Sequence, residues 1–132
     1  MFFITINCLQ RGTNSLCNES VAEIIRQTVA FRQARGDWWV HLLLLMPDHL
    51  HALITFSRKV SVRDAVSAWK EYVARLTGVD WHHDFFDHRL RGRESVEEKT
   101  HDVRMNPVRR GLCARPEDWP YVWTDLSESR PR

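Results

Sequence analysis

The feature that most constrains the fold is a pair of apolar runs, residues 38–46 and 49–56, separated by a break at Pro47. They read WWVHLLLLM and HLHALITF. Proline cannot donate a hydrogen bond to a neighbouring strand, so the break marks a strand end or turn. Each run is far shorter than the roughly 20 apolar residues that a membrane-spanning helix needs. We therefore expect a β-hairpin in the core, with Trp38 and Trp39 buried at the start of its first arm.

The second arm of this hairpin carries two histidines one residue apart, His49 and His51. Successive side chains of a strand point to opposite faces of the sheet, so both imidazoles should lie on the same face. Two imidazoles side by side provide half of a metal site. The chain has seven histidines, and a pair of hydrogen-bonded, half-buried histidines explains the pattern as well. Both interpretations remain open at this point.

The rest of the chain alternates between strand-like and helix-like patterns. Residues 1–9 are rich in aromatic and β-branched residues, as in a strand. Two segments have apolar residues at helical spacing, and Ser61 is a suitable N-cap for the second. The predicted elements are strand 1–9, helix 19–36, the hairpin, helix 61–78, strand 85–92 and a third helix 94–106 that Pro107 should end. This order predicts an α+β fold, a ferredoxin-like split β-α-β-β-α-β antiparallel sheet with an additional C-terminal helix.

Length, charge and cysteine content narrow the class of protein. The 132 residues suit a single domain, which we place at 1–126, followed by a short tail at 127–132. A net charge of +2 on 19 basic and 17 acidic residues is too mild to indicate a nucleic-acid partner by itself. The three cysteines are scattered and odd in number, which fits a reducing compartment and predicts a cytoplasmic protein.

The third helix supplies candidates for the other half of a metal site. The two crossover helices should cover one face of the sheet, so the histidine pair should face the third helix. Asp102 and Asn106 lie four residues apart and project from one side of it. Two imidazoles and an amide or carboxylate oxygen, with positions left for water, suit Mg²⁺ or Mn²⁺. Asn106 also precedes a proline, and a helix-ending residue is an equally simple explanation for it.

Several motifs resemble one known family when they are taken in order. They are FFITIN in the first strand, LMPDHLHALITF in the hairpin, WKEYVARLTG in the second helix, FFDHRLRG in the next strand, and NPVRRGLCARPEDWPY near the end. Together they span nearly the whole chain, and this set is similar to the HUH single-strand DNA transposases. Within that group the chain resembles the REP-associated tyrosine transposases, which are IS200-like.

This resemblance implies a chemistry. In the family, two histidines and a polar residue hold a divalent ion at the scissile phosphate, and a tyrosine attacks phosphorus. The resemblance therefore assigns His49, His51 and Asn106 as metal ligands, with Mg²⁺ or Mn²⁺ as the cofactor. The family tyrosine lies four residues before the asparagine, and this chain has Asp102 there.

The replacement at Asp102 makes the enzymatic activity uncertain. A carboxylate attacking phosphorus would give an acyl phosphate, which hydrolyses, rather than a lasting link to DNA. The chain is then a catalytically silenced or repurposed DNA binder, or Asp102 acts as a metal ligand or as a base on water. The chain has two tyrosines, Tyr72 and Tyr121, and neither is at the nucleophile's place. The remaining alternatives are that Tyr72 substitutes as the nucleophile, or that the nucleophile position lies elsewhere than at Asp102.

Arginines cluster around the last strand and the third helix. The candidate DNA-binding residues are Arg89, Arg91, Arg93, Arg104, Arg109 and Arg110. They could neutralise phosphates along a groove, although the glutamates among them also fit an ordinary solvated surface. The expected partner is single-stranded or hairpin DNA, without a membrane, and the protein acts as a monomer or homodimer. The alternative function is a metal-binding or protein-interaction module that uses the same scaffold without DNA.

Overall fold

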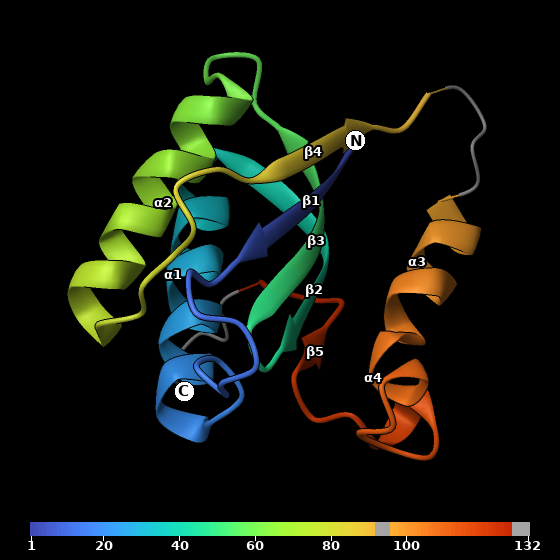
Figure 1. Ribbon diagram of the computed structural model, residues 1–132. Helices are drawn as coiled ribbons and strands as arrows, with labels where there is room; N and C mark the ends of the chain where they lie inside the picture. The colour runs from blue at the N-terminus through green and yellow to red at the C-terminus, as the bar shows by residue number, and fades with distance from the viewer. Residues whose placement is uncertain (92–95, 128–132) are drawn as a thin grey trace, which may run out of the picture.

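The computed structural model describes residues 1–91 and 96–127, which form a twisted antiparallel sheet with helices on both faces (Figure 1). Within these residues the strand order is β4-β1-β3-β2-β5. The strands are β1 (Phe2–Asn7), β2 (Trp38–Met46), β3 (His49–Phe56), β4 (Phe86–Arg89) and β5 (Val122–Trp123). The helices are α1 (Glu19–Arg35), α2 (Val62–Thr77), α3 (Val96–Arg104) and the short α4 (Asn106–Arg109), and a 3₁₀ turn, η1, covers Pro116–Asp118. The predicted ferredoxin-like α+β fold is confirmed, with β5 added at the edge beside β2.

The predicted hairpin forms the centre of the sheet. β2 and β3 pair with Met46 opposite His49, so the turn consists of Pro47 and Asp48. A bulge between Val40 and Leu42 shifts the alternation of β2 by one residue. Before the bulge the even-numbered residues of β2 face α1 and α2, and after it the odd-numbered ones do.

Helices α1 and α2 cover one face of the sheet, and both begin and end where the sequence indicates. The amide of Val21 donates to the side chain of Asn18, and that of Asp64 donates to Ser61 Oγ, so the first turns are capped. Gly36 and Gly78 close the two helices with φ of 93° and 75°, a conformation that glycine adopts without steric cost. The core between these helices and the sheet includes Ile4, Ile25, Leu43, Leu45, Leu50, Val66 and Trp69.

Helix α3 lies on the opposite face of the sheet (Figure 1). Val103 is its buried residue, and it packs in a second, smaller cluster with Leu42, Leu44, Met46 and Leu53. The segment after α4 returns to the sheet, where Trp119 Nε1 donates a 2.9 Å hydrogen bond to the carbonyl of Leu45. The sheet is therefore covered from both sides, by a large apolar layer on one face and a small one on the other.

The structure corrects three expectations. Pro107 does not end the third helical segment, since it lies in the first turn of α4, where its missing N–H costs no hydrogen bond. Asn106 is consequently the first residue of α4 and not part of the last turn of α3. Trp39 is 52% exposed and not in the core, because it points to the face opposite Trp38.

The described part of the chain includes no helix long and apolar enough to cross a membrane.

Candidate functional site

The histidine pair lies on the sheet face that carries α3 and α4. The neighbouring residues Leu50 and Ala52 belong to the core beneath α1 and α2, and Leu53 packs against Val103 of α3. His49 and His51 thus project away from the two crossover helices, as the strand alternation predicts. Their ring centroids are 4.9 Å apart, with the rings at 80° to each other.

Each imidazole is held by a hydrogen bond at Nδ1. His49 Nδ1 lies 2.7 Å from Asp48 Oδ1, and His51 Nδ1 lies 2.9 Å from Thr5 Oγ1 on the adjacent strand β1. A carboxylate can only accept, so Nδ1 of His49 carries the proton and Nε2 carries the lone pair. The Thr5 hydroxyl accepts from His51 in the same way when Nδ1 is protonated. These contacts orient both rings with Nε2 as the ligand atom, the arrangement in which outer hydrogen bonds position metal-binding histidines.

Asp48 lies in the turn between β2 and β3 and is held by the loop that follows β1. Its Oδ2 accepts from the Gly12 amide at 2.8 Å and from Arg11 Nε at 3.0 Å. Burial tends to raise the pKa of the Asp48 carboxyl, but the hydrogen bonds from Gly12, His49 and Arg11 outweigh burial and hold this pKa well below its usual range. The carboxylate is therefore ionised at neutral pH and available to orient His49.

Both histidines are neutral at neutral pH. Burial lowers the pKa of His51 most, the charges of His49, Lys99 and Arg110 lower it as well, and Asp102 opposes them, which together bring this pKa to about 3. Burial also lowers the pKa of His49, against the opposing effect of Asp48. A neutral imidazole with a free lone pair is the form that binds a metal ion. The chemistry of these donor atoms thus fits a divalent cation.

One stripe of α3 and α4 faces the pair. The charges of Lys99, Asp102 and Arg110 all act on the pKa of His51, and Asn106 lies four residues from both Asp102 and Arg110. The helical hydrogen bonding continues across the joint, because the Met105 amide donates to His101 and the Arg109 amide donates to Met105. Residues three or four apart on a helix share a face. This spacing predicts Asn106 on the side of the segment that faces the histidines.

Asp102 has a partner of its own. Arg109 donates from Nη2 to Asp102 Oδ1 and from Nη1 to the Asp102 carbonyl, both at 2.9 Å. The Asp102 side chain is 56% exposed. Arg109, a predicted DNA-contacting residue, is thus engaged within the helical segment.

The other arginines of the candidate DNA surface are spread along β4 and α3. Arg89, Arg91 and Arg110 are exposed, and Arg104 is half-buried. Arg93 lies outside the described residues. Sequence reasoning missed Lys99, whose Nζ lies 4.2 Å from the centroid of the Phe3 ring, beside the stacked pair of Phe3 and His51.

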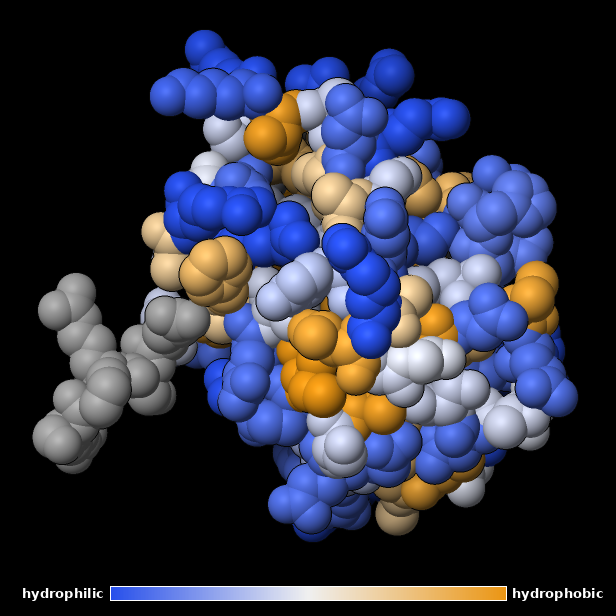
Figure 2. Space-filling model, turned by 90° about the vertical axis from the view of Figure 1, so that its left-hand side faces the viewer, coloured by the Kyte–Doolittle hydropathy of each residue, from blue (hydrophilic) through white to orange (hydrophobic). Residues whose placement is uncertain are grey.

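Both tyrosines lie away from this face. Tyr72 lines a groove between α1 and α2 with Ile24, Phe31 and Leu76, and the guanidinium of Arg32 sits 5.5 Å over its ring. Figure 2 looks onto this helical layer and shows apolar side chains surrounded by hydrophilic ones. The whole sheet separates Tyr72 from the histidine pair. Tyr121 packs against the core that lies beneath the same two helices.

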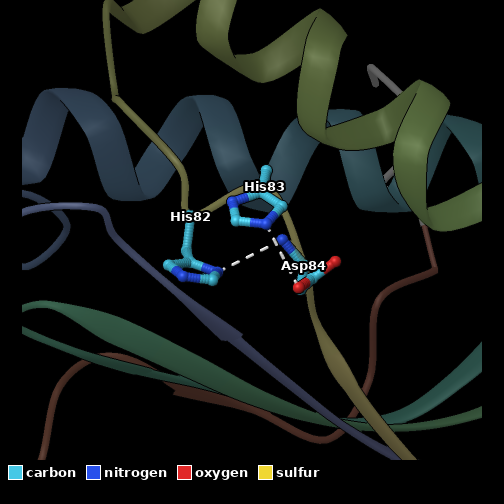
Figure 3. A group of neighbouring side chains, drawn as sticks. All are labelled: His82, His83 and Asp84. Atoms are coloured by element: carbon cyan, nitrogen blue, oxygen red, sulfur yellow. Dashed lines mark hydrogen bonds and ion pairs between the residues drawn. The ribbon is translucent and has the colours of Figure 1, made fainter.

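A further group of ligand-type side chains lies in the α2–β4 connection. His82, His83 and Asp84 each offer one ligand atom, and these atoms lie within 4.8 Å of one another (Figure 3). From the sequence these histidines are poor ligand candidates, because they lie in a turn without a strand or helix to align them. The sequence signal that could have indicated this group is that His82, His83 and Asp84 are consecutive.

Comparison with known proteins finds similarity to transposases, both in sequence and in fold. No family model matches. The chain is 22% identical over 125 residues to the REP-associated tyrosine transposase of Escherichia coli (strain K12), a match covering 91% of this chain and 73% of that protein.

The fold has matches among solved structures. A REP-associated tyrosine transposase bound to a REP hairpin superposes with a TM-score of 0.80 at 18% identity, over 92% of this chain and 74% of that one. A protein from Deinococcus radiodurans described as a transposase superposes with a TM-score of 0.56 at 15% identity, over 77% of this chain and 88% of that one. The chain is a homologue of the REP-associated tyrosine transposases and shares their fold.

Proposed function

We propose that this protein binds hairpin or single-stranded DNA across the sheet face that carries the histidine pair, together with Mg²⁺ or Mn²⁺. A REP-associated tyrosine transposase of similar fold is bound to a REP hairpin, which supports a hairpin as the ligand here. On this chain the same face combines neutral, oriented imidazoles with basic residues of α3 and α4. We include in this proposal that residues 1–126 act as one domain, that the protein is a monomer or homodimer, and that it acts in the cytoplasm.

The metal would be held by His49, His51 and Asn106. Asp48 and Thr5 orient the two rings, and their contacts keep Nε2 of each ring available. A divalent ion bound there supplies positive charge that polarises a phosphate group. The low pKa of His51 keeps its ring neutral well below neutral pH, so binding needs no proton release from this ligand.

The position of Asp102 argues against a covalent step. The resemblance assigns Asp102 to the position of the family's nucleophilic tyrosine, and its carboxylate accepts from Arg109. Tyr72 and Tyr121 belong to the other side of the sheet. We therefore propose that the chain binds DNA without forming a tyrosine–DNA link, as a silenced or repurposed member of the group. Arg109 bonds only Oδ1 of this carboxylate, so a role of Asp102 as a metal ligand or as a base on water through Oδ2 is the alternative to silencing.

Positive charge at the histidine face is the observation that carries the proposal. Lys99 and Arg110 act on His51, and Arg11 and Arg110 act on His49. The cations Arg11, Lys99 and Arg110 therefore outnumber the carboxylates Asp48 and Asp102 around this pair of neutral rings. A local positive field of this kind attracts phosphate groups.

The test is binding of labelled DNA measured by fluorescence anisotropy at several salt concentrations. A hairpin with a single-stranded flank is compared with a duplex of the same base composition. The variant Lys99→Gln/Arg110→Gln removes two charges at the histidine face, and Lys59→Gln/Arg63→Gln removes two exposed charges from the segment that begins α2. We expect the parent to prefer the hairpin, and the first variant alone to bind more weakly, with a salt slope reduced by about one to two.

Equal affinity for hairpin and duplex would contradict hairpin recognition. Equal losses of DNA affinity in the two variants would show that binding depends on the net charge of the protein and not on the histidine face.

A further inference from the structure

The connection from α2 to β4 brings together three ligand-type side chains outside the histidine face. His82 Nδ1 accepts a 3.2 Å hydrogen bond from the Asp84 amide, and His83 Nε2 lies 3.3 Å from Asp84 Oδ2. The two imidazole rings stack with centroids 4.5 Å apart. In Figure 3 the side chains of His82 and His83 both lie beside Asp84.

The backbone of this connection is held from two sides. Lys70 of α2 is 7% exposed, and its Nζ donates to the carbonyls of His82 and Asp84 at 2.7 and 3.3 Å. On the other side the His82 amide donates to the carbonyl of Asn7 at 2.8 Å. A buried ammonium bonded to two carbonyls is costly to displace. The three residues are therefore presented by a fixed segment of backbone.

We propose that His82, His83 and Asp84 form a second divalent-metal site, selective for the borderline transition metals Zn²⁺, Ni²⁺, Co²⁺ and Cu²⁺. Two imidazole nitrogens and one carboxylate oxygen suit these ions better than Mg²⁺, which prefers oxygen ligands. The remaining coordination positions are open to solvent, since His83 and Asp84 are exposed.

Only a small rearrangement is needed to bind an ion. Ligand atoms about 2.0–2.2 Å from a metal lie roughly 3 Å from one another, whereas here they lie within 4.8 Å. The side chains of His83 and Asp84 are 80% and 76% exposed, so they can rotate toward His82 without disturbing the core. The contacts from Lys70 act on the backbone and remain in place.

This site is separate from the histidine pair. Asn7 pairs with His49 on one side and accepts from the His82 amide on the other. Two strand spacings make about 10 Å between the backbones of residues 49 and 82. That is well beyond the roughly 4 Å between ions in a two-metal centre. The inference therefore stands independently of the proposed function.

The test is a titration of the ¹⁵N-labelled protein with Ni²⁺ or Cu²⁺, followed by nuclear magnetic resonance. A paramagnetic ion broadens the amide signals near it, and an ion at the histidine pair would also reach residues 81–85, so every form tested carries His49→Ala/His51→Ala. We expect substoichiometric metal to broaden signals at residues 81–85, at concentrations that leave those around the exposed His101 sharp. In His83→Ala/Asp84→Ala this broadening should be lost. The matched variant His101→Ala/Glu71→Ala, which removes an exposed histidine and an exposed carboxylate elsewhere, should behave as the parent.

Broadening at residues 81–85 that survives in His83→Ala/Asp84→Ala would overturn the proposal. So would broadening there that needs as much metal as broadening at His101, since a single exposed histidine would then account for it. The dispersion of the amide spectrum shows in the same experiment that each variant is folded.

Discussion

Arg109 holds Asp102 through two hydrogen bonds, one to the carboxylate and one to the main-chain carbonyl, each 2.9 Å long. The second bond does not depend on the side chain at position 102. The helical segment can therefore accept another residue there with the loss of one exposed ion pair, which contributes about 0.2–1 kcal/mol.

Asp102→Tyr is the first prediction. It places a phenol one helical turn before Asn106, on the stripe that faces His51. With Mn²⁺ and a single-stranded substrate that carries a hairpin, we expect this variant to form a covalent protein–DNA adduct on a denaturing gel, and the parent to form none. Asp102→Phe is the matched control, because it has the ring without the hydroxyl. An adduct from the parent, or none from the tyrosine variant, would contradict this prediction.

Thr5→Val tests the orientation of His51. Valine keeps the shape of threonine but removes the hydroxyl that lies 2.9 Å from His51 Nδ1. We expect the affinity for Mn²⁺ to fall about 10- to 100-fold, the usual effect of losing an outer hydrogen bond to a metal ligand, as measured by calorimetric titration. Thr55→Val is the control, since it removes the bond from Thr55 to His41 on a neighbouring part of the sheet. Similar affinities in the two variants would show that Thr5 does not support a metal site.

Val103→Ala tests how α3 is attached to the sheet. Val103 is 1% exposed against Leu44 and Leu53, and losing its two methyl groups should lower the free energy of unfolding by about 2 kcal/mol. Val96→Ala on the same helix removes an exposed side chain and should cost less than about 0.5 kcal/mol. Urea denaturation gives both values. Equal effects would mean that α3 is not fixed through Val103.

The cysteines give a prediction about pH. Burial raises the pKa of Cys8 to about 11 and that of Cys17 to about 12, from 9.0. At about pH 8 the thiolate of Cys8 should thus be about a hundredfold scarcer in the folded chain than in the unfolded one, and iodoacetamide should label both residues correspondingly slowly.

Mass spectrometry of timed samples, with and without urea, measures the labelling rates of the cysteines. Because both pKa values are raised on folding, their contribution to stability is complete below pH 9 and declines as the pH rises through the folded values. Equal labelling rates of Cys8 with and without urea would contradict the assignment.

Local signals in the sequence were enough for most of the fold. Pro47 divides two apolar runs into a hairpin, and Ser61 and Gly78 bound α2 through interactions with their own neighbours in the chain. The register of His49 and His51 follows from strand alternation alone. These features depend on interactions between residues that are close in the sequence, so local sequence patterns are enough to predict them.

Features that depend on tertiary contacts were missed. β5 has two residues, Val122 and Trp123, and forms only because β2 offers Leu43 and Leu44 as partners. From the sequence, Pro107 predicts the end of a helix, although proline is also common in the first turn of a helix. Which of the two positions it takes depends on how α3 packs against the sheet.

The contacts that organise the candidate site are also tertiary. The support of His51 by Thr5 joins residues 46 positions apart, and no local pattern indicates it. The same holds for the carbonyls of His82 and Asp84 that Lys70 holds from another element.

The division of the sheet into two unequal faces has a consequence for how this scaffold tolerates change. The large core beneath α1 and α2 supplies most of the buried apolar surface, and the candidate site contributes little to it. A chain built in this way tolerates substitution at the exposed positions of its candidate site. The residue at position 102 can be exchanged while folding is left almost unaffected, so the loss of a nucleophile that we propose there would leave the framework unchanged.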